Sequence, residues 1–150
     1  GYGHSLALKS DGTVWSWGRN VNGQLGVSTG RSHTLNPTRI PDLDGIVAIA
    51  ARGEVSMALK CDGTVWMWGI NTGGQLGYSE PNAAFSRIPI KVTGLDNIVA
   101  IAATIDRGFA VRDDGVVYGW GLIAFAQLGH STGARATTPV QVGTFGTMRG

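Results

Sequence analysis

Short apolar stretches separated by polar turns run along the whole chain, and many of them alternate with a period of two. Trp15 and Trp17 lie two positions apart, as do Trp66 and Trp68 and then Tyr118 and Trp120. This spacing places both aromatic side chains on one face of a β-strand, where large aromatic residues are favoured. An Asp-Gly pair precedes each of these strands, and such a pair between apolar runs is typical of a β-hairpin turn. We therefore predict hairpin turns at residues 11–12, 62–63 and 114–115.

Two continuous apolar runs complete the pattern, at residues 46–51 and 98–103. Uninterrupted runs of this length are typical of strands whose two faces are both buried, so we expect inner strands there. The stretches 27–36, 78–88 and 130–138 are polar or mixed and lie close to prolines, and we expect surface loops in them. Since no stretch keeps a helical period, the chain is predicted to be all-β.

One segment occurs three times along the chain. His4–Gly26, Val55–Gly77 and Arg107–Gly129 align without gaps, and their Asp-Gly pairs lie 51 and then 52 residues apart. Their Gln-Leu-Gly ends keep the same steps, and the segment that begins at Leu43 is repeated at Leu95. Internal repeats of this size indicate an array of like supersecondary units. We therefore divide the chain, taken as a single repeat domain, into units of approximately 1–42, 43–94 and 95–150.

Four short strands per unit, with sheet faces buried on both sides, are typical of the blades of a β-propeller. Ala7–Gly26 and Ala58–Gly77 follow the pattern A-L-x-x-D-G-x-V-x-x-W-G-x-N-x-x-G-Q-L-G almost throughout. Through this pattern the chain resembles the regulator of chromosome condensation family. The resemblance implies a ring of seven four-stranded antiparallel blades, of which this chain supplies about three.

About three blades cannot close a ring, because propellers close with four to eight. The first unit begins with Gly1-Tyr2-Gly3-His4, which corresponds to the end of a segment whose apolar part would precede it. Pro139–Val142 is likewise not followed by another apolar run. We expect the chain to be a piece of an incomplete ring, completed by the remaining blades of a longer chain or by other copies.

The composition allows a packed core, since 43% of the residues are hydrophobic and 15% are charged. Twelve basic and ten acidic residues give a net charge of +2, and the basic residues are scattered along the chain. Neither nucleic acid nor a membrane is therefore predicted as a partner. Cys61 is the only cysteine, which excludes an intrachain disulfide and a cysteine-based zinc cage. The first residue is Gly rather than Met, so the sequence gives no prediction of localisation.

No catalytic constellation can be assembled from the motifs. His4 lies just before a predicted strand, where we expect a structural hydrogen bond. His33 and His130 lie in loops without a carboxylate or a second histidine at ligand spacing, and the motifs H-E-x-x-H and G-x-S-x-G are absent. An aspartate recurs at every hairpin, which indicates turn-making rather than catalysis. We predict no enzymatic activity, no cofactor and no metal.

Residues that differ between the units are the candidates for function, since repeat scaffolds carry binding in their loops. Where the first two units have polar loops, the third has Ile123-Ala124-Phe125-Ala126. An apolar loop there indicates a contact patch, with packing against a neighbouring loop or blade as the alternative. Arginines in or beside the long loops indicate an interface, with solvated loop charge as the alternative. The candidate partner-binding residues are Arg31, His33, Arg87, Ile123, Phe125 and Arg135.

These features favour a non-enzymatic scaffold that binds a protein partner, of unknown identity, through its loops. A second possibility follows from the resemblance, whose founding member is a guanine-nucleotide exchange factor for the small GTPase Ran. The recurring residues here are mostly structural and do not carry that activity by themselves. A third possibility is a secreted bacterial propeller that binds or inhibits another protein. A signal peptide in the full-length sequence would favour the third, and basic tails of nuclear type would favour the second.

Overall fold

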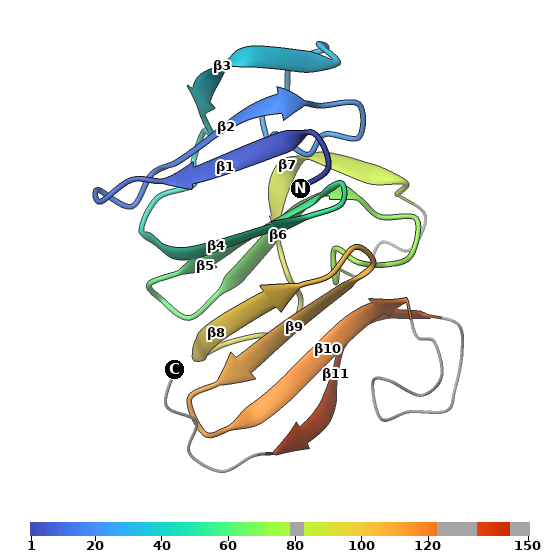
Figure 1. Cartoon of the computed structure of the whole chain (residues 1–150). Helices are drawn as coiled ribbons and strands as arrows, with labels where there is room; N and C mark the ends of the chain where they lie inside the picture. The colour runs from blue at the N-terminus through green and yellow to red at the C-terminus, as the bar shows by residue number, and fades with distance from the viewer. Residues whose placement is uncertain (79–82, 123–134, 145–150) are drawn as a thin grey trace.

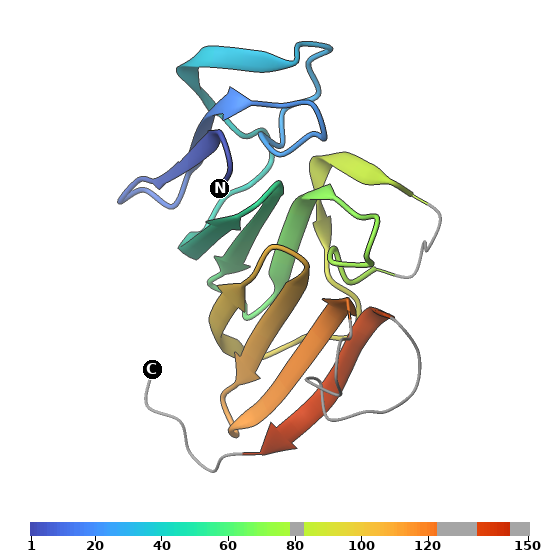
Figure 2. The same ribbon diagram turned by 45° about the vertical axis from the view of Figure 1, so that its right-hand side comes forward.

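Three antiparallel β-sheets stacked on one another in chain order make up the structure (Figure 1 and Figure 2). The computed structural model describes residues 1–78, 83–122 and 135–144, and this part of the chain contains no helix. The first sheet holds β1 (His4–Leu8), β2 (Val14–Arg19) and β3 (His33–Arg39). The second holds β4 (Ile46–Arg52), β5 (Val55–Lys60), β6 (Val65–Ile70) and β7 (Phe85–Lys91). The third holds β8 (Ile98–Ala103), β9 (Arg107–Arg112), β10 (Val116–Leu122) and β11 (Arg135–Thr144).

Strands that follow one another in sequence are hydrogen-bonded neighbours in every sheet, and all pairs are antiparallel. This meander is the arrangement expected of propeller blades. The prediction of an all-β chain with three blade-like sheets is confirmed. The first sheet has three strands, whereas the other two have four.

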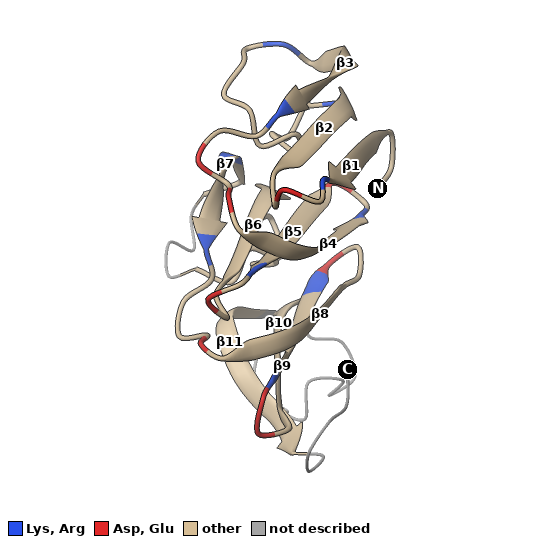
Figure 3. Cartoon of the chain, turned by 90° about the vertical axis from the view of Figure 1, so that its left-hand side faces the viewer, with Lys and Arg blue, Asp and Glu red and all other residues tan. Residues whose placement is uncertain are grey.

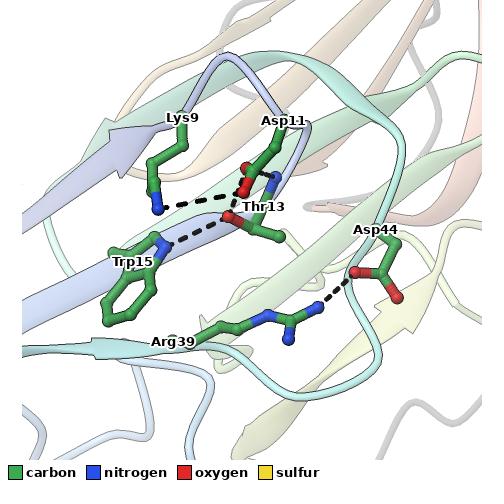
Figure 4. A network of polar contacts seen from close by, with 6 residues as sticks. All are labelled: Lys9, Asp11, Thr13, Trp15, Arg39 and Asp44. Atoms are coloured by element: carbon green, nitrogen blue, oxygen red, sulfur yellow. Dashed lines mark hydrogen bonds and ion pairs between the residues drawn. The ribbon is translucent and has the colours of Figure 1, made fainter.

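The Asp-Gly pairs form the predicted hairpin turns. In the first turn, Asp11 Oδ1 accepts hydrogen bonds from the backbone N–H and the hydroxyl of Thr13, at 3.0 and 2.6 Å. The hydroxyl oxygen of Thr13 in turn accepts a bond from the indole Nε1 of Trp15 at 3.1 Å (Figure 4). The bonds from the Thr13 side chain and backbone hold the pKa of the Asp11 carboxyl below its usual range. Asp62 repeats these contacts, so the prediction that the recurring aspartates make turns is confirmed.

The second sheet is buried on both faces. Trp68 packs with Val14 and Ile40 in the hydrophobic core between the first and second sheets. Met67, the residue before Trp68 in the same strand, belongs to the core that the second sheet shares with Trp120 of the third. Because strand side chains alternate between the two faces, one strand supplies both cores. Full burial of an apolar side chain such as that of Met67 stabilises the folded state by about 1.5–3 kcal/mol.

The six repeated aromatic residues occupy equivalent positions, but their burial differs. Trp68 and Trp120 are fully buried between sheets. The rings nearer the turns are half-buried beneath a cation of the same hairpin, as for Lys9 over Trp15 and for the equivalent pairs Lys60 with Trp66 and Arg112 with Tyr118. Trp17 is half-buried because no described strand packs on its face of the first sheet. Burial is therefore complete for two of the six rings and partial for the other four.

The two continuous apolar runs form β4 and β8, and each of these strands lies at the edge of its sheet. Ala50 packs toward the third sheet and Ile49 toward the first, so β4 has neighbours on both faces. Val47 and Val99 nevertheless remain 56% and 46% exposed. The two faces of β4 are therefore covered as predicted, but β4 and β8 are edge strands rather than inner strands, and both are only partly buried. The most buried strands are β5 and β6, in the middle of the second sheet.

The outermost strand of each sheet begins inside a stretch that the sequence predicts as loop. β3, β7 and β11 start at residues 33, 85 and 135, within the stretches 27–36, 78–88 and 130–138. These strands are irregularly paired, and each contains a proline, namely Pro37, Pro89 and Pro139. Proline lacks a backbone donor but is tolerated at sheet edges, where it also hinders pairing with other chains. The loop prediction is therefore wrong for the second part of each stretch.

An indole hydrogen bond joins each sheet to the one before it. Trp68 Nε1 donates to the carbonyl of Gln24, and Trp120 Nε1 donates to the carbonyl of Gln75, both at 2.9 Å. The glycines that end the first two Gln-Leu-Gly segments, Gly26 and Gly77, lie directly against these indoles. A Cβ atom at Gly26 would lie 2.8 Å from Trp68 Nε1, where no side chain fits. The repeated Trp and the repeated Gln-Leu-Gly are therefore two halves of one joint between sheets.

Candidate interaction surface

The polar residues that recur in the repeats are occupied by the scaffold. Asn20 Oδ1 accepts a bond from the backbone N–H of Leu25 at 3.1 Å, and its amide donates to the carbonyl of Arg31 at 3.2 Å. Gln24 Oε1 accepts from the backbone N–H of Asn22 at 2.9 Å. Asn71 and Gln75 make the corresponding contacts in the second unit. These side chains close the loop after the second hairpin strand, so Gln24 and Gln75 serve the scaffold.

His4 is the one buried histidine of the described residues, and it lies in the joint between the first two sheets. Ser56 Oγ donates to the carbonyl of Gln24 at 2.7 Å and contacts His4 Nε2 at 2.9 Å. Since the serine proton goes to the carbonyl, His4 Nε2 is the donor in the second bond. Burial, with a smaller effect of the nearby amino terminus, lowers the pKa of His4 to about 4. The expected structural hydrogen bond is confirmed.

The described residues contain no group of three or more His, Cys, Asp or Glu side chains arranged to hold a metal ion. Within the same residues, no helix has the length and apolar character that a membrane span requires.

Antiparallel strands bring the connections of the chain to two opposite ends of the stack, seen at the left and right of Figure 1. We call the left end the turn face; it consists of the hairpin turns 9–13, 60–64 and 112–116 and the connections 39–45 and 91–97. We call the right end the loop face; it consists of residues 1–3, 19–32, 52–54, 70–78, 83–87 and 103–107. Any interaction carried by connecting segments therefore falls on one face or the other.

The turn face holds most of the carboxylates of the described chain, and Figure 3 looks onto it. Its acidic residues are Asp11, Asp42, Asp44, Asp62, Asp96, Asp113 and Asp114, and its basic residues are Lys9, Arg39, Lys60, Lys91 and Arg112. Several of the cations are paired: Arg39 with Asp44 at 2.6 Å and Arg112 with Asp114 at 2.7 Å. Salt bridges of this exposed kind contribute little stability, and together with Lys9–Asp11 they engage six of these twelve charges. Seven acidic and five basic residues give the turn face a net charge of −2.

The loop face has the opposite balance. Its basic residues are Arg19, Arg31, Arg52, Arg87 and Arg107, and its described acidic residues are Glu54 and Asp106. Arg19 pairs with Glu54 at 3.5 Å, and Arg107 pairs with Asp106 at 3.7 Å. No carboxylate of the described residues lies within ion-pair distance of the other three arginines. All described lysines lie on the turn face, so every basic side chain of the described loop face is an arginine.

The unpaired arginines line two hollows of the loop face. Arg31 and Arg87 lie beside Val21 in the first, where the outer parts of the first and second sheets meet. The Arg87 guanidinium also lies 5.0 Å from the centre of the Phe85 ring. Arg52 lines the second hollow together with Tyr2, Ile105, Asp106 and Arg107. Val21, Tyr2 and Ile105 are exposed, so each hollow combines unpaired guanidinium groups with accessible apolar surface.

Three of the residues predicted for binding lie in the described part with their side chains. Arg31 and Arg87 share the first hollow, and Arg31 and the exposed His33 also border a separate hollow along β3. Ile123 and Phe125 lie outside the described residues. Arg135 begins β11, and its side chain lies outside the described part.

Sequence reasoning missed Arg52, Arg107, Tyr2 and Val21. Arg52 and Arg107 belong to strand ends rather than long loops, and Tyr2 and Val21 carry no charge. The sequence nevertheless indicates where these residues lie. Once the hairpins are known, the alternating strand directions assign each strand end to one of the two faces.

The stack of meander sheets joined by recurring indole bonds defines the chain as a run of consecutive β-propeller blades. The family model for the regulator of chromosome condensation (RCC1) repeat matches residues 11–59 and 62–106. The chain belongs to this repeat family.

Solved structures with the same fold include two propeller proteins. A crystal structure of Prp20p from Saccharomyces cerevisiae, described with its binding properties to Gsp1p and histones, superposes with a TM-score of 0.82 at 26% identity. The match covers 95% of this chain and 36% of that chain. Human WBSCR16 superposes with a TM-score of 0.80 at 28% identity, over 93% of this chain and 37% of that chain.

Similar sequences include two human proteins that are much longer than this chain. The human protein named Probable E3 ubiquitin-protein ligase HERC3 is 34% identical over 131 residues, which cover 86% of this chain and 12% of the relative. The human protein named Probable E3 ubiquitin-protein ligase HERC6 is 38% identical over 136 residues, covering 87% of this chain and 13% of the relative. The chain therefore spans only a small part of the length of these relatives.

Proposed function

We propose that the chain is a non-enzymatic scaffold that binds a protein partner through its loop face. The observation that supports this proposal is that the recurring polar residues are engaged within the scaffold, whereas non-recurring ones are accessible. Those that recur between units, such as Asp11, Asn20 and Gln24, are occupied in turns and joints. Those that do not recur include Arg31 and Arg87, which are accessible on the loop face. Arginine is enriched among the residues that dominate protein interfaces.

Site-specific photo-crosslinking tests this proposal. A photoreactive amino acid at exposed Val21 probes the loop face, and the same group at exposed Ser10 is the matched control on the turn face. We expect a saturable protein adduct from position 21 that unlabelled protein competes away, and none from position 10. Adducts from position 10 alone, or from neither position, would contradict the proposal.

Guanine-nucleotide exchange on a Ran-type GTPase is the second candidate function. It is favoured by the likeness to Prp20p, which is described with its binding to Gsp1p. The test is the release of labelled guanine nucleotide from such a GTPase with and without the protein. Release faster than the spontaneous rate would replace the scaffold proposal, whereas an unchanged rate leaves the scaffold proposal standing.

A further inference from the structure

We infer that the loop face recognises an acidic polypeptide segment that also carries apolar side chains. This inference rests on the proposed function, because it names the chemistry of the partner that the same face would bind. Its starting point is the uneven distribution of charge between the two faces of the stack.

The charge of the loop face is available to a partner. Arg31 and Arg52 are exposed, and no described residue forms an ion pair with either of them. Among the described residues, no carboxylate pairs with Arg87, whose guanidinium lies over the face of the Phe85 ring. A planar guanidinium offers a fork of donors that matches a carboxylate in two-point contact. A carboxylate is thus the complementary group for each of these three arginines.

The apolar residues between the arginines define the second requirement. Tyr2 and Val21 are 64% and 47% exposed, and Ile105 is 51% exposed. Each of them borders one of the two hollows that the arginines line. A partner that covers both kinds of surface needs acidic and apolar side chains interspersed. Interfaces with a desolvated apolar centre and charged groups around it are typical of protein–protein recognition.

The same features favour a polypeptide over nucleic acid. Glu54 and Asp106, paired with Arg19 and Arg107, lie among the arginines of the loop face, so its basic surface is not continuous. The described loop face contains no lysine, and its accessible apolar groups include aliphatic side chains that cannot stack on bases. Sequence-tolerant binding of single strands relies on aromatic platforms along a continuous basic groove.

Charge reversal with a matched control tests the inference. The double variant Arg31→Glu/Arg87→Glu changes the first hollow, and Arg52→Glu changes the second. Lys91→Glu is the control, because it makes the same kind of charge change at an exposed residue of the turn face. Three labelled peptides of equal length serve as probes: glutamate-rich with interspersed leucine, lysine-rich with interspersed leucine, and neutral. Fluorescence anisotropy measures their affinities, and tryptophan emission with thermal melting verifies that each variant is folded.

We expect the acidic peptide to bind the parent protein, and to bind less tightly when salt rises from about 50 to about 300 mM. The double arginine variant should weaken this binding by about tenfold or more, with Lys91→Glu within about twofold of the parent. If reversal destabilises the protein, Arg31→Gln/Arg87→Gln should still weaken binding in the same direction.

Four results would overturn the inference. The first is equal weakening by Lys91→Glu, which would show a general charge effect. The second is tighter binding of a duplex DNA of similar length than of the acidic peptide. The third is failure of the acidic peptide to bind. The fourth is binding of the neutral or lysine-rich peptide that the loop-face variants abolish, which would refute an acidic partner while keeping the proposed scaffold function. The crosslinking experiment above tests that function independently.

Discussion

Trp68 combines two interactions in one side chain, since its ring is fully buried between sheets and its Nε1 donates to the carbonyl of Gln24. Trp17 occupies the equivalent position in the first sheet but is only half-buried. Trp68→Ala should therefore lower the free energy of unfolding by about 3–5 kcal/mol, the range for deleting a large buried aromatic. Trp17→Ala should cost about half as much or less. Urea denaturation of both variants makes the comparison, and equal losses would show that the indole joint contributes nothing special.

Alanine substitutions at three glycines distinguish the effect of a steric clash from the effect of a positive φ. Gly69 has a φ of 106°, and a Cβ there would lie 2.2 Å from the carbonyl oxygen of Glu54. Gly94 has a φ of 75° with no atom within 4 Å of a Cβ, and Gly30 has open space without a positive φ. We expect Gly69→Ala to cost more than about 3 kcal/mol, Gly94→Ala about 1 kcal/mol, and Gly30→Ala less than about 0.5 kcal/mol. Chemical denaturation measures this order, and a mild Gly69→Ala would show that β6 can shift away from Glu54.

At the scale of elements, His4 couples β1 to β5 through Ser56, and this link predicts a dependence of stability on pH. The pKa of His4 is lowered to about 4 in the folded chain, while the unfolded chain takes up a proton near pH 6.5. Between these values the unfolded state binds more protons, so stability falls as the pH falls. Each unit of pKa difference is worth about 1.4 kcal/mol. The imidazole ring of His4 lies close to the exposed first residues, where solvent screens part of its interaction energy. We therefore expect the free energy of unfolding to fall by about 2 kcal/mol as the pH is lowered through this range.

Urea melts at a series of pH values test this coupling. His4→Gln keeps a donor for Ser56 but removes the titration, so its stability should change less between pH 6.5 and 4. His33→Gln, at an exposed histidine of β3, should follow the parent. If His4→Gln shows the same change of unfolding free energy with pH as the parent protein, the pH dependence arises from other groups. The turn aspartates, whose pKa values are also lowered, contribute in the same direction only at lower pH.

Local patterns predict the elements whose causes are local. The Asp-Gly turns and the strands around Trp15 and Trp66 follow from residues within a few positions of one another. The edge strands β3 and β7 escape prediction because their prolines and polar residues suit both loops and sheet edges. The indole bonds between sheets join residues 44 and 45 positions apart. The recurrence of Trp and of Gln-Leu-Gly along the chain is consistent with these long-range contacts, but no local pattern predicts them.

At the scale of the whole molecule, the candidate surface was predictable only in part. Long loops pointed to Arg31 and Arg87, which share a hollow. The charge balance between the faces depends on which strand ends lie together, and this follows from the sheet topology rather than from the scattered order of charges along the chain. Arg52, at the end of β4, becomes part of the loop face only in the folded stack.

The outer sheets of the stack are less covered than the middle one, and this predicts association of the chain. Val65 and Met57 are fully buried in the second sheet, whereas their equivalents Val117 and Phe109 in the third are half-buried. Trp17 shows the same contrast with Trp68 at the other end. No described strand packs over these outer faces, and neighbouring interfaces supply much of the stability of repeat arrays. Covering apolar surface is worth about 25 cal/mol per Å², so contact between outer faces should be favourable by several kcal/mol.

We therefore expect the 150-residue chain to associate as its concentration rises from about 1 to about 100 µM, and its melting temperature to rise in parallel. Light scattering measures the association, and calorimetry at both concentrations measures the melting temperature. Trp17→Ser should weaken association by removing apolar surface from one outer face, while Lys91→Glu, remote from both outer faces on the turn face, should leave it unchanged. A monodisperse monomer with a cooperative melt above about 60 °C, beyond the middle of the range for ordinary domains, would show instead that the outer faces are satisfied without a further sheet.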